Sequence, residues 1–327
     1  MRETVTVHYR SPTLSAAKPV LAVTLPTFRR PEHLERTLQS LAEQTLDRPF
    51  AVVVMENDAE GMAGAKVAAR FFETGTLEGL VVVAHERGNC SAYNAGWTTA
   101  LQTFDDMRHL AVIDDDEVAD PRWLERLLTS AEATGADFVG GPQVPRFDAP
   151  QVAPSVSRHP VFNPHYSETG LVPILYSSGN VLIARRVLEA MERPFLDPSF
   201  NFLGGGDSDF YARARQKGFT FAWCAEAPVY ETIPARRTEF SWLNARSLRN
   251  GAISSIIERR RDGSAAGRAR SLLKSAALLA ASPIRGIGLG LKARSATVGL
   301  YPLQVAIGRF QGEIGIANEQ YRSPEQN

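Results

Sequence analysis

The chain has 327 residues, of which 44% are hydrophobic and 22% are charged, a composition that excludes disordered, collagen-like and disulfide-rich proteins. Its two cysteines, Cys90 and Cys224, are too few for a disulfide framework or a four-thiolate zinc site. The formal net charge is zero, from 36 basic and 36 acidic residues, which argues against a global polyanion binder and thus against a nucleic-acid partner.

Residues 1–19 form a predicted N-terminal extension of polar and mixed charge. No basic stretch there leads into an apolar core, so we expect no signal peptide. No window reaches the ~18 uninterrupted apolar residues of a membrane span. The best candidates, Ser275–Leu291 and Ala296–Gly308, are interrupted by an arginine or by prolines. We therefore expect a cytoplasmic protein body.

The first half alternates short apolar runs with stretches of helical spacing. The expected buried strands are Val20–Leu25, Phe50–Met55, Leu80–Ala84 and His109–Ile113. The expected helices are Pro31–Gln44, Met62–Thr74 and Cys90–Leu101. This alternation predicts an α/β fold, with a Rossmann-like, mostly parallel sheet flanked by helices on both faces. Ligands in such sheets bind at the carboxyl ends of the strands, so the residues after each strand are site candidates.

The pattern changes beyond residue 116. Pro142–Val172 is rich in Pro, Ser and His, and we expect an irregular binding loop or lid there. The other expected elements are helices at Pro121–Thr134, Asp207–Lys217 and Glu239–Arg261, and strands at Asp137–Gly141, Val181–Ala184, Phe219–Trp223 and Pro228–Tyr230. The predicted domains are a catalytic domain at 20–262, with a nucleotide-binding half (20–118) and an acceptor half (119–262), and a basic helical region at 263–327.

Polar residues follow the first two predicted strands. Pro26 and Thr27 lead into a helix, and Arg30 is placed to reach a phosphate; an ordinary strand–helix turn is the alternative. Glu56 and Asp58 follow the second strand and can accept hydrogen bonds from a base or ribose. A surface turn is the alternative for that pair.

The third strand is followed by a segment that opens the next helix. Gly88 allows close backbone approach, and Asn94 can bind a polar ligand edge. Helix capping by Asn89 or Ser91 would explain part of this segment without a ligand.

The fourth strand ends in four consecutive acids, Asp114 to Glu117. Carboxylates at a buried strand end repel one another unless a cation or an arginine compensates. Magnesium and manganese favour such oxygen ligands and typically take one or two carboxylates together with phosphate oxygens. A solvated acidic loop is the alternative, which the apolar strand before it disfavours.

A glycine-rich segment, Gly204–Gly206, leads into Asp207 and Asp209. Glycines let the backbone lie against a ligand. A helix N-terminus favours the ionised carboxylate that a general base needs at neutral pH. The alternative for Asp207 is an ordinary helix N-cap.

Taken in chain order, these pieces resemble the family 2 glycosyltransferases of GT-A fold. The likeness rests on Pro-Thr-x-x-Arg, Glu-Asn-Asp, Gly-Asn-x-x-x-x-Asn-x-Gly, Asp-Asp-Asp and Gly-Gly-x-Asp-x-Asp, and it runs from Leu21 to about Gly251. Downstream residues resemble the bacterial succinoglycan-biosynthesis-type branch; they are Tyr230, Glu231, Pro234, Arg237, Trp242, Arg246, Arg249 and Gly251.

The resemblance implies roles for individual residues. Asp116 and Asp114, the ends of a DXD motif, would hold Mn²⁺ or Mg²⁺, and Asp207 would be the base that deprotonates the acceptor hydroxyl. The nucleotide-sugar pocket would be lined by Pro26, Thr27, Arg30, Glu56, Asp58, Asn94, Asp114 and Asp115. Two positions depart from the family. Gly206 replaces the glutamate of a Glu-Asp pair, whose work Asp209 is a candidate to share, and Glu231 stands where a metal-binding histidine is frequent.

The implied activity is that of an inverting, metal-dependent, hexosyltransferase-type enzyme. It would move a sugar from a nucleotide diphosphate-sugar, most commonly a UDP-sugar, to a hydroxyl of a glycan or lipid-linked glycan in cell-surface polysaccharide or glycolipid synthesis. One alternative is a degenerate, non-catalytic nucleotide-sugar-binding or membrane assembly protein. Another is a haloacid-dehalogenase-type phosphatase with Asp114 as nucleophile, but none of the five lysines lies between Asp116 and Asp207, where that family needs one.

The neutral net charge conceals an asymmetry. Residues 1–232 carry 21 basic and 30 acidic side chains, whereas residues 233–327 carry 15 basic and 6 acidic ones. Ser264–Gly312 mixes cations with Leu-, Ala- and Ile-rich stretches, which is typical of amphipathic helices that bind anionic membrane surfaces. We therefore expect peripheral attachment at the cytoplasmic face of the inner membrane. A helical pair with a solvated basic face is the alternative.

Overall fold

The structure, a computed structural model, describes residues 4–14, 18–149, 151–316 and 322. The chain divides into two compact units. The first comprises residues 1–143, 165–202 and 206–231, and the second comprises residues 144–164, 203–205 and 232–327. The first unit contains the large sheet and all of the predicted site residues.

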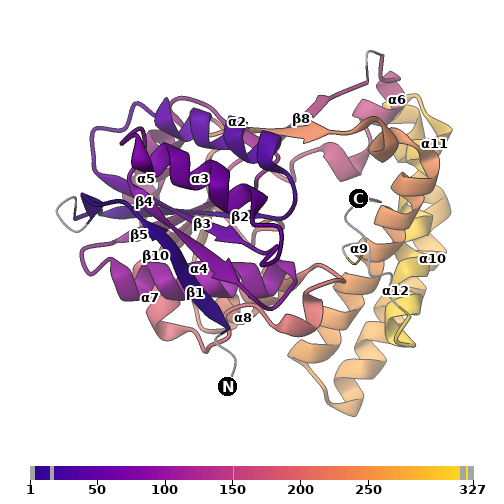
Figure 1. Ribbon diagram of the computed structural model, residues 1–327. Helices are drawn as coiled ribbons and strands as arrows, with labels where there is room; N and C mark the ends of the chain where they lie inside the picture. Colours follow the sequence, from indigo (N-terminus) through magenta and orange to yellow (C-terminus); the bar gives the residue numbers. More distant parts are fainter. Residues whose placement is uncertain (1–3, 15–17, 150, 317–321, 323–327) are drawn as a thin grey trace. The chain divides into compact units, whose positions relative to one another are not determined.

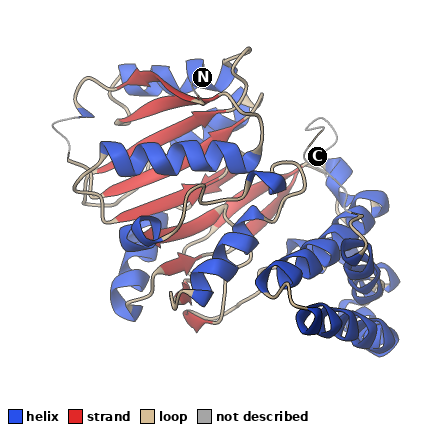
Figure 2. Cartoon of the chain, turned by 90° about the horizontal axis from the view of Figure 1, so that it is seen from below, coloured by secondary structure: helices blue, strands red, loops and turns tan. Residues whose placement is uncertain are grey.

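The first unit is built on a nine-stranded sheet of order β1-β4-β3-β2-β5-β10-β7-β11-β9 (Figures 1 and 2). Strands β2, β3, β4 and β5 run parallel, as the alternation of strands and helices predicts, and β10 is antiparallel to both of its neighbours. The strands are β1 (Val5–Arg10), β2 (Leu21–Thr27), β3 (Phe50–Glu56), β4 (Gly79–Ala84), β5 (His109–Ile113), β7 (Phe138–Gly140), β9 (Gly170–Val172), β10 (Asn180–Ala184) and β11 (Phe221–Trp223).

Helices cover both faces of this sheet. Figure 1 shows α2, α3 and α5 on one face and α4, α7 and α8 on the other. Apolar residues of α2, α3 and α5 share one core with alternate residues of β2, β3 and β4, the pattern expected where one strand face meets a helix layer. The helices are α2 (Pro31–Ala42), α3 (Ala63–Glu73), α4 (Asn89–Thr103), α5 (Trp123–Thr134), α7 (Arg185–Ala190) and α8 (Gly206–Gln216). The predicted α/β fold class is confirmed.

Two segments differ from their sequence-based expectation. Val5–Arg10, within the predicted N-terminal extension, forms β1 and pairs antiparallel with β4 at the sheet edge. The expected irregular stretch 142–172 contains β8 (Gln143–Phe147), α6 (Pro154–Ser157), the 3₁₀ helix η1 (Pro160–Phe162) and β9. Short strands such as these depend on cross-strand partners distant in sequence, which local patterns do not contain.

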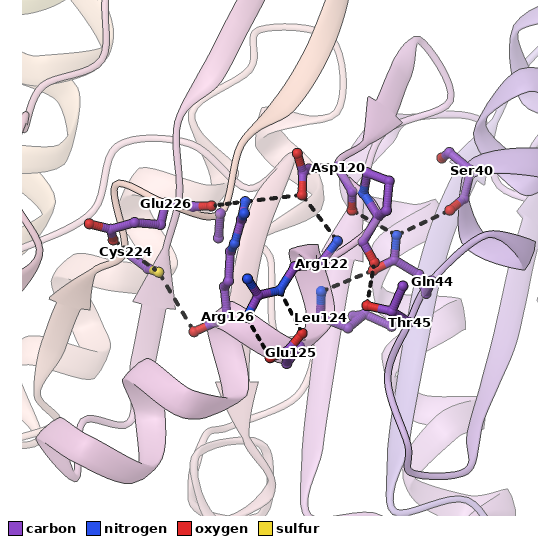
Figure 3. Close-up of polar contacts among 12 residues, drawn as sticks. Ser40, Gln44, Thr45, Asp120, Arg122, Leu124, Glu125, Arg126, Cys224 and Glu226 are labelled. Carbon is purple, nitrogen blue, oxygen red and sulfur yellow. Dashed lines mark hydrogen bonds and ion pairs between the residues drawn. The ribbon is translucent and has the colours of Figure 1, made fainter.

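The corner that follows the acidic run is held by a polar network at the start of α5 (Figure 3). The Gln44 side-chain amide donates to the Asp120 carbonyl at 2.8 Å and accepts from the Leu124 backbone N–H at 3.0 Å. The Arg126 guanidinium pairs with the Asp120 carboxylate at 3.0 Å and also donates to the Glu226 carbonyl. These bonds fix the chain just beyond β6 (Glu117–Ala119), which pairs antiparallel with β12 (Val229–Ile233).

The second unit is mainly helical. It contains α9 (Phe240–Arg261), α10 (Ala265–Ala293), α11 (Ala296–Gly299), α12 (Tyr301–Glu313) and the 3₁₀ turn η3 (Ala235–Thr238). Helix α10 runs through Pro283, and the Ser282 hydroxyl donates to the Leu279 carbonyl, the acceptor that the missing proline N–H would have used. Within the described ranges, α10 alone has the length and composition to cross a membrane. Pro283 and Arg285 therefore do not interrupt the helix itself.

Candidate active site

The candidate site lies where the order of parallel strands reverses. Strand β2 has β3 on one side and β5 on the other, so the carboxyl ends of β2 and β5 form the switch point at which sheets of this kind bind ligands. Thr27 ends β2, and the acidic run begins directly after Ile113 of β5. The doubly wound topology thereby brings together two motifs that are far apart in the sequence.

The first group at this switch point joins the two strand ends. The Thr27 hydroxyl donates to the Asp115 carboxylate at 2.9 Å. The Arg30 guanidinium reaches Asp115 at 3.4 Å and Asp116 at 3.0 Å. Burial acts to lower the pKa of the Arg30 guanidinium, but the charges of Asp115, Asp116 and Asp114 together outweigh it and raise the pKa. Arg30 therefore neutralises part of the acidic run and leaves its net charge negative.

Asp114 lies beside further polar groups. The Tyr93 hydroxyl of α4 donates to the Asp114 carboxylate. The Asp114 backbone N–H donates to the Glu117 carboxylate at 2.9 Å. Burial and then the charge of Asp116 raise the pKa of Asp114 to about 7, and Glu231 of β12 adds to this repulsion. Glu231 is thus an electrostatic neighbour of the cluster.

The neighbouring acids are similarly destabilised in their charged form. Burial raises the pKa of Asp115 to about 7, with Arg30 opposing and Asp116 adding to the shift. Burial and the charge of Asp114 raise the pKa of Glu117 well above its ordinary value. The Gln143 amide donates to Glu117. A site that concentrates this much destabilised negative charge fits a bound cation.

The chemistry of these donors fits a divalent cation completed by ligand oxygens. Among the described residues, no group of three or more His, Cys, Asp or Glu side chains is arranged to hold a metal ion by itself. Mg²⁺-type sites in nucleotide-binding proteins use one or two carboxylates, with phosphate and water completing the octahedron. Asp114 and Asp116 supply hard carboxylate oxygens of that kind.

Gly179 forms a wall of this cluster. A Cβ atom there would lie 2.7 Å from a Glu117 carboxylate oxygen and 2.9 Å from an Asp114 carboxylate oxygen. The Gln143 amide nitrogen would lie closer still, at 2.5 Å, so a side chain at position 179 would displace at least one of these three groups. The backbone of Gly179 has no positive φ, so close approach is the constraint at this position.

The candidate base comes from another element, the helix α8. Asp207 is in the first turn of α8 and accepts a hydrogen bond from the Ser208 backbone N–H at 2.7 Å. The buried Tyr211 hydroxyl, which donates to the Ser177 carbonyl, has its pKa raised by burial and then by the charges of Asp207 and Asp114. Both carboxylates are therefore electrostatic neighbours of one hydroxyl. Asp209 is directed elsewhere, into an ion pair with Arg213 at 2.8 Å.

Gly206 occupies a position with no room for a larger residue. A Cβ atom there would lie 2.5 Å from the Cys90 sulfur and 3.5 Å from atoms of Leu196 and Phe200. Cys90 is buried, and burial raises the pKa of its thiol. The glutamate that the family resemblance predicts at position 206 would therefore clash with the Cys90 sulfur.

We expect Gly206→Ala to lower the free energy of unfolding by about 1–3 kcal/mol through overpacking. Cys90→Ala should remove most of that penalty in the double variant, because it deletes the clashing sulfur. Urea denaturation of the two single variants and the double variant gives the coupling. Equal penalties for Gly206→Ala with and without Cys90 would contradict the steric explanation.

Two of the predicted nucleotide-binding residues, Asp58 and Glu56, have partners close by in the sequence. Asp58 is held by Arg29 at 2.7 Å, and this hydrogen bond lowers its pKa. The Glu56 carboxylate is fully buried and accepts from the Asp58 and Ala65 backbone N–H groups at 2.9 and 3.0 Å, so it fixes the start of α3. Both carboxylates therefore have protein partners within this loop.

Asn94 differs from the acidic residues in its surroundings. Its amide donates to the Leu196 carbonyl at 2.7 Å and accepts from the Leu196 backbone N–H at 2.9 Å. These contacts of Asn94 tie α4 to the segment before α8. The remaining predicted residue, Pro26, is part of β2 and pairs with Met55 of β3.

Tyr93 and Gly179 were not expected as neighbours of Asp114, and no separate role was expected for Glu117. Tyr93 precedes the predicted Asn94, and its position on α4 gives no signal by itself. A pattern search can find acids after a strand, but the hydroxyl that contacts them comes from another element.

Comparison with known proteins gives a consistent family. The model of Glycosyl transferase family 2 matches residues 22–190. The succinoglycan biosynthesis protein ExoM of Rhizobium meliloti is 33% identical over 232 residues, which cover 69% of this chain and 71% of ExoM. The glycosyltransferase AglE of Haloferax volcanii is 25% identical over 227 residues, which cover 68% of this chain and 69% of AglE.

Solved structures show the same fold at low identity. The mannosyltransferase PcManGT from Pyrobaculum calidifontis, in complex with GDP-Man and Mn²⁺, has a TM-score of 0.57 at 18% identity. The match covers 93% of this chain and 88% of the PcManGT chain. S. aureus TarS, in complex with UDP, has a TM-score of 0.50 at 14% identity, covering 92% and 91%.

Proposed function

Because this chain belongs to glycosyl transferase family 2, we propose that it is an inverting, metal-dependent enzyme that transfers a sugar from a nucleotide diphosphate-sugar to an acceptor hydroxyl in polysaccharide synthesis. A UDP-sugar is the proposed donor, and a glycan or lipid-linked glycan is the proposed acceptor. The enzyme class and the role in polysaccharide synthesis follow the relatives. The metal, the stereochemistry and the nucleotide are our proposals.

One observation carries this proposal. The charges of Asp114, a candidate metal ligand, and Asp207, the candidate base, both act on the buried Tyr211 hydroxyl. Direct displacement requires one group beside the leaving diphosphate and one beside the acceptor, and the shared influence on Tyr211 supports assigning Asp114 and Asp207 to one site. The raised pKa of Asp114 supports a cation partner there.

In the proposed mechanism, the strand ends hold the donor. Thr27, Arg30 and Asp115 form a fixed hydrogen-bonded frame on one side of the diphosphate position. Asp114 and Asp116 would hold a divalent ion, which would supply Lewis-acid stabilisation of the charge on the leaving diphosphate. Tyr93 and Glu117 orient Asp114 through its carboxylate and its backbone N–H.

Asp207 is the proposed general base. Its place in the first turn of α8 favours the ionised carboxylate. An Oδ atom of this carboxylate takes the proton of the sugar-acceptor hydroxyl as the hydroxyl oxygen attacks the anomeric carbon. Among the proposed catalytic groups there is one base and no nucleophile, so a single displacement inverts the anomeric configuration.

The direct test is a transfer assay with a panel of nucleotide diphosphate-sugars, Mn²⁺ and short glycan acceptors. We expect metal-dependent release of one nucleoside diphosphate, and NMR should show a product anomer opposite to that of the donor. Retention of configuration would contradict the single-displacement mechanism. Tight donor binding without turnover would favour a non-catalytic nucleotide-sugar-binding protein, for which the missing glutamate at Gly206 is the motivating observation.

The raised acidic pKa values predict a pH-dependent response to metal. A carboxyl whose pKa rises from ~3.9 when unfolded to about 7 when folded favours the protonated folded state. The contribution of such a group to stability is present below the unfolded pKa and is lost as pH rises from about 4 to about 7. Metal binding requires the deprotonated form. We therefore expect Mn²⁺ to raise the melting temperature more at pH 8 than at pH 6.

Thermal denaturation at pH 6, 7 and 8, with and without Mn²⁺, measures this difference. The Asp114→Asn/Asp116→Asn double variant is the control and should lose the metal-dependent part at every pH. A shift of equal size at pH 6 and pH 8 in the unmodified chain would contradict the assignment of the titrating groups to the metal site.

The proposed place of the reaction is the cytoplasm or the cytoplasmic face of the inner membrane. The nucleotide-sugar donor is the proposed partner of the strand ends in the first unit. Acidic residues predominate in the chain up to Thr232, whereas basic residues predominate beyond it. A contact with an anionic surface is therefore expected from the second unit.

A further inference from the structure

Helix α10 buries small and polar residues where a helix of a water-soluble bundle buries large apolar ones. Its buried positions follow a single stripe at helical spacing. They are Gly267, Ser271, Ser275, Ser282, Gly286 and Ala293. The stripe contains no leucine or isoleucine.

The helices that α10 packs with, α9 and α12, meet each other in the same way. A Cβ at Gly251 of α9 would lie 2.1 Å from the Val305 carbonyl oxygen of α12. A Cβ at Gly308 of α12 would lie 1.9 Å from the Leu248 carbonyl oxygen of α9. The buried Arg309 joins the three helices through Glu258 at 2.6 Å and Ser275 at 3.0 Å. Close backbone packing through small residues, with polar groups inside, is typical of helices whose outer face meets lipid.

The large apolar side chains of α10 point away from this bundle. Leu273 is 70% exposed, Ile284 79%, Ile287 65% and Leu291 75%. On a helix with 3.6 residues per turn, these four positions fall within about a quarter of the circumference. An apolar face of this kind is costly in water, and it marks an interaction surface.

Cations line one edge of that face. Arg270, Lys274, Arg285 and Lys292 are 4, 11 and 7 residues apart, spacings that keep them in one row along the helix. Arg270 and Lys274 form ion pairs with Asp262 and Glu258 of the same unit. Arg285 and Lys292 have no acidic partner in the part of the chain that the structure describes.

We propose that α10 lies in the plane of an anionic membrane, with its apolar face in the outer hydrocarbon and its row of cations at the lipid headgroups. The row selects an anionic lipid surface by charge complementarity, whereas a second protein copy would need acids opposite it. Apolar and cationic rows that run together along a helix are the pattern of interfacial binding.

The length and the charge of α10 favour this in-plane orientation over a membrane-spanning one. Helix α10 has 29 residues and is therefore about 43 Å long, which exceeds the ~30 Å of a hydrocarbon core. Arg285 lies between the exposed Ile284 and Ile287. A spanning helix would place its charge in the hydrocarbon, whereas an in-plane helix leaves it at the headgroups.

Flotation of the full chain with lipid vesicles tests the surface independently of catalysis. We expect co-flotation with phosphatidylcholine vesicles that contain anionic phosphatidylglycerol, and little with phosphatidylcholine alone. The apolar variant Ile284→Ser/Ile287→Ser/Leu291→Ser should reduce binding at least tenfold. The charge variant Arg285→Gln/Lys292→Gln should reduce it by about fivefold per cation, and high salt should do the same.

Matched controls come from the first unit. Leu171 is 69% exposed on β9, and Arg36 is exposed on α2, so Leu171→Ser and Arg36→Gln remove similar groups elsewhere. Both should float like the unmodified chain. Flotation of the apolar variant at the unmodified level would overturn the proposal. So would a dimer in light scattering that the apolar variant dissociates, with no vesicle binding by either form.

Depth measurement separates lying on the membrane from crossing it. Both native cysteines are buried, so single cysteines introduced by Ala276→Cys and Leu291→Cys can be labelled selectively with a fluorophore. Quenching by lipids brominated at known depths should place both labels at the same shallow level. Labels near opposite surfaces, with a third at Ile284→Cys near the bilayer centre, would overturn the in-plane orientation.

Failure of this proposal and failure of the proposed transferase can be told apart. The apolar variant should retain donor binding and transfer to a short soluble acceptor, since the substituted residues are exposed on the second unit. The loss of lipid binding with retained transfer is the expected pair of results.

Discussion

Asp207→Asn should lower the rate of sugar transfer by about 10²–10⁴-fold, the usual contribution of a general base. Asparagine has nearly the same shape and can still accept a hydrogen bond from the Ser208 backbone N–H, so the start of α8 should keep its structure. Donor affinity should change by less than about threefold, because the base contacts the acceptor. Steady-state kinetics and calorimetry with the donor measure these two quantities separately.

Asp209→Asn is the matched control for this result. Asp209 lies two residues further along α8, but its carboxylate pairs with Arg213, whose guanidinium also contacts the Phe195 carbonyl. We expect Asp209→Asn to reduce stability and to leave transfer within about tenfold of the unmodified rate. The opposite ranking of the two variants would move the role of base to Asp209.

Asp116→Asn should abolish metal-dependent donor binding and reduce transfer at least ~100-fold. The metal supplies several kcal/mol of charge stabilisation on the leaving group. The substitution also removes an acceptor of Arg30 at 3.0 Å. Donor calorimetry with and without Mn²⁺ should show that the metal-dependent difference in affinity disappears.

Asp120→Asn is a control from the same corner. Asp120 follows β6 and is bound by Arg126 in the network that fastens α5 (Figure 3). The Asp120→Asn variant should keep the metal dependence of donor binding and should have a lower melting temperature. If Asp116→Asn retained full metal dependence, the ion would have to bind elsewhere.

The parallel part of the sheet could be predicted because each strand is a continuous apolar run. Val52, Val53 and Val54, for example, are fully buried, as expected for a strand covered on both faces. The edge strand β1 could not be predicted, since its side chains are mostly half-exposed and its order depends on pairing with β4. Local composition therefore identifies central strands better than edges.

The acidic centre was predictable for a similar reason. Charged residues directly after a buried strand have few explanations other than a ligand, so the run that begins at Asp114 stands out. The partners of Asp114 were not predictable. Tyr93 and Gly179 reach it from α4 and from the chain before β10, and only the fold brings them there.

The sequence identified the basic, apolar character of the C-terminal region but not its arrangement. Hydropathy counts treat Ile284 and Ser275 as members of one mixed segment. The structure separates them, with Ser275 fully buried and Ile284 largely exposed. This inversion requires knowledge of which face the other helices cover.

Isothermal titration with UDP, GDP and thymidine diphosphate, each with and without Mn²⁺, is the sharpest test of a metal-assisted nucleotide site. We expect one diphosphate, UDP, to bind with an affinity that Mn²⁺ raises at least tenfold. The Asp114→Asn/Asp116→Asn variant should lose that increase. Binding of no diphosphate, or binding that is identical with and without metal, would contradict a metal-assisted nucleotide site at the ends of β2 and β5.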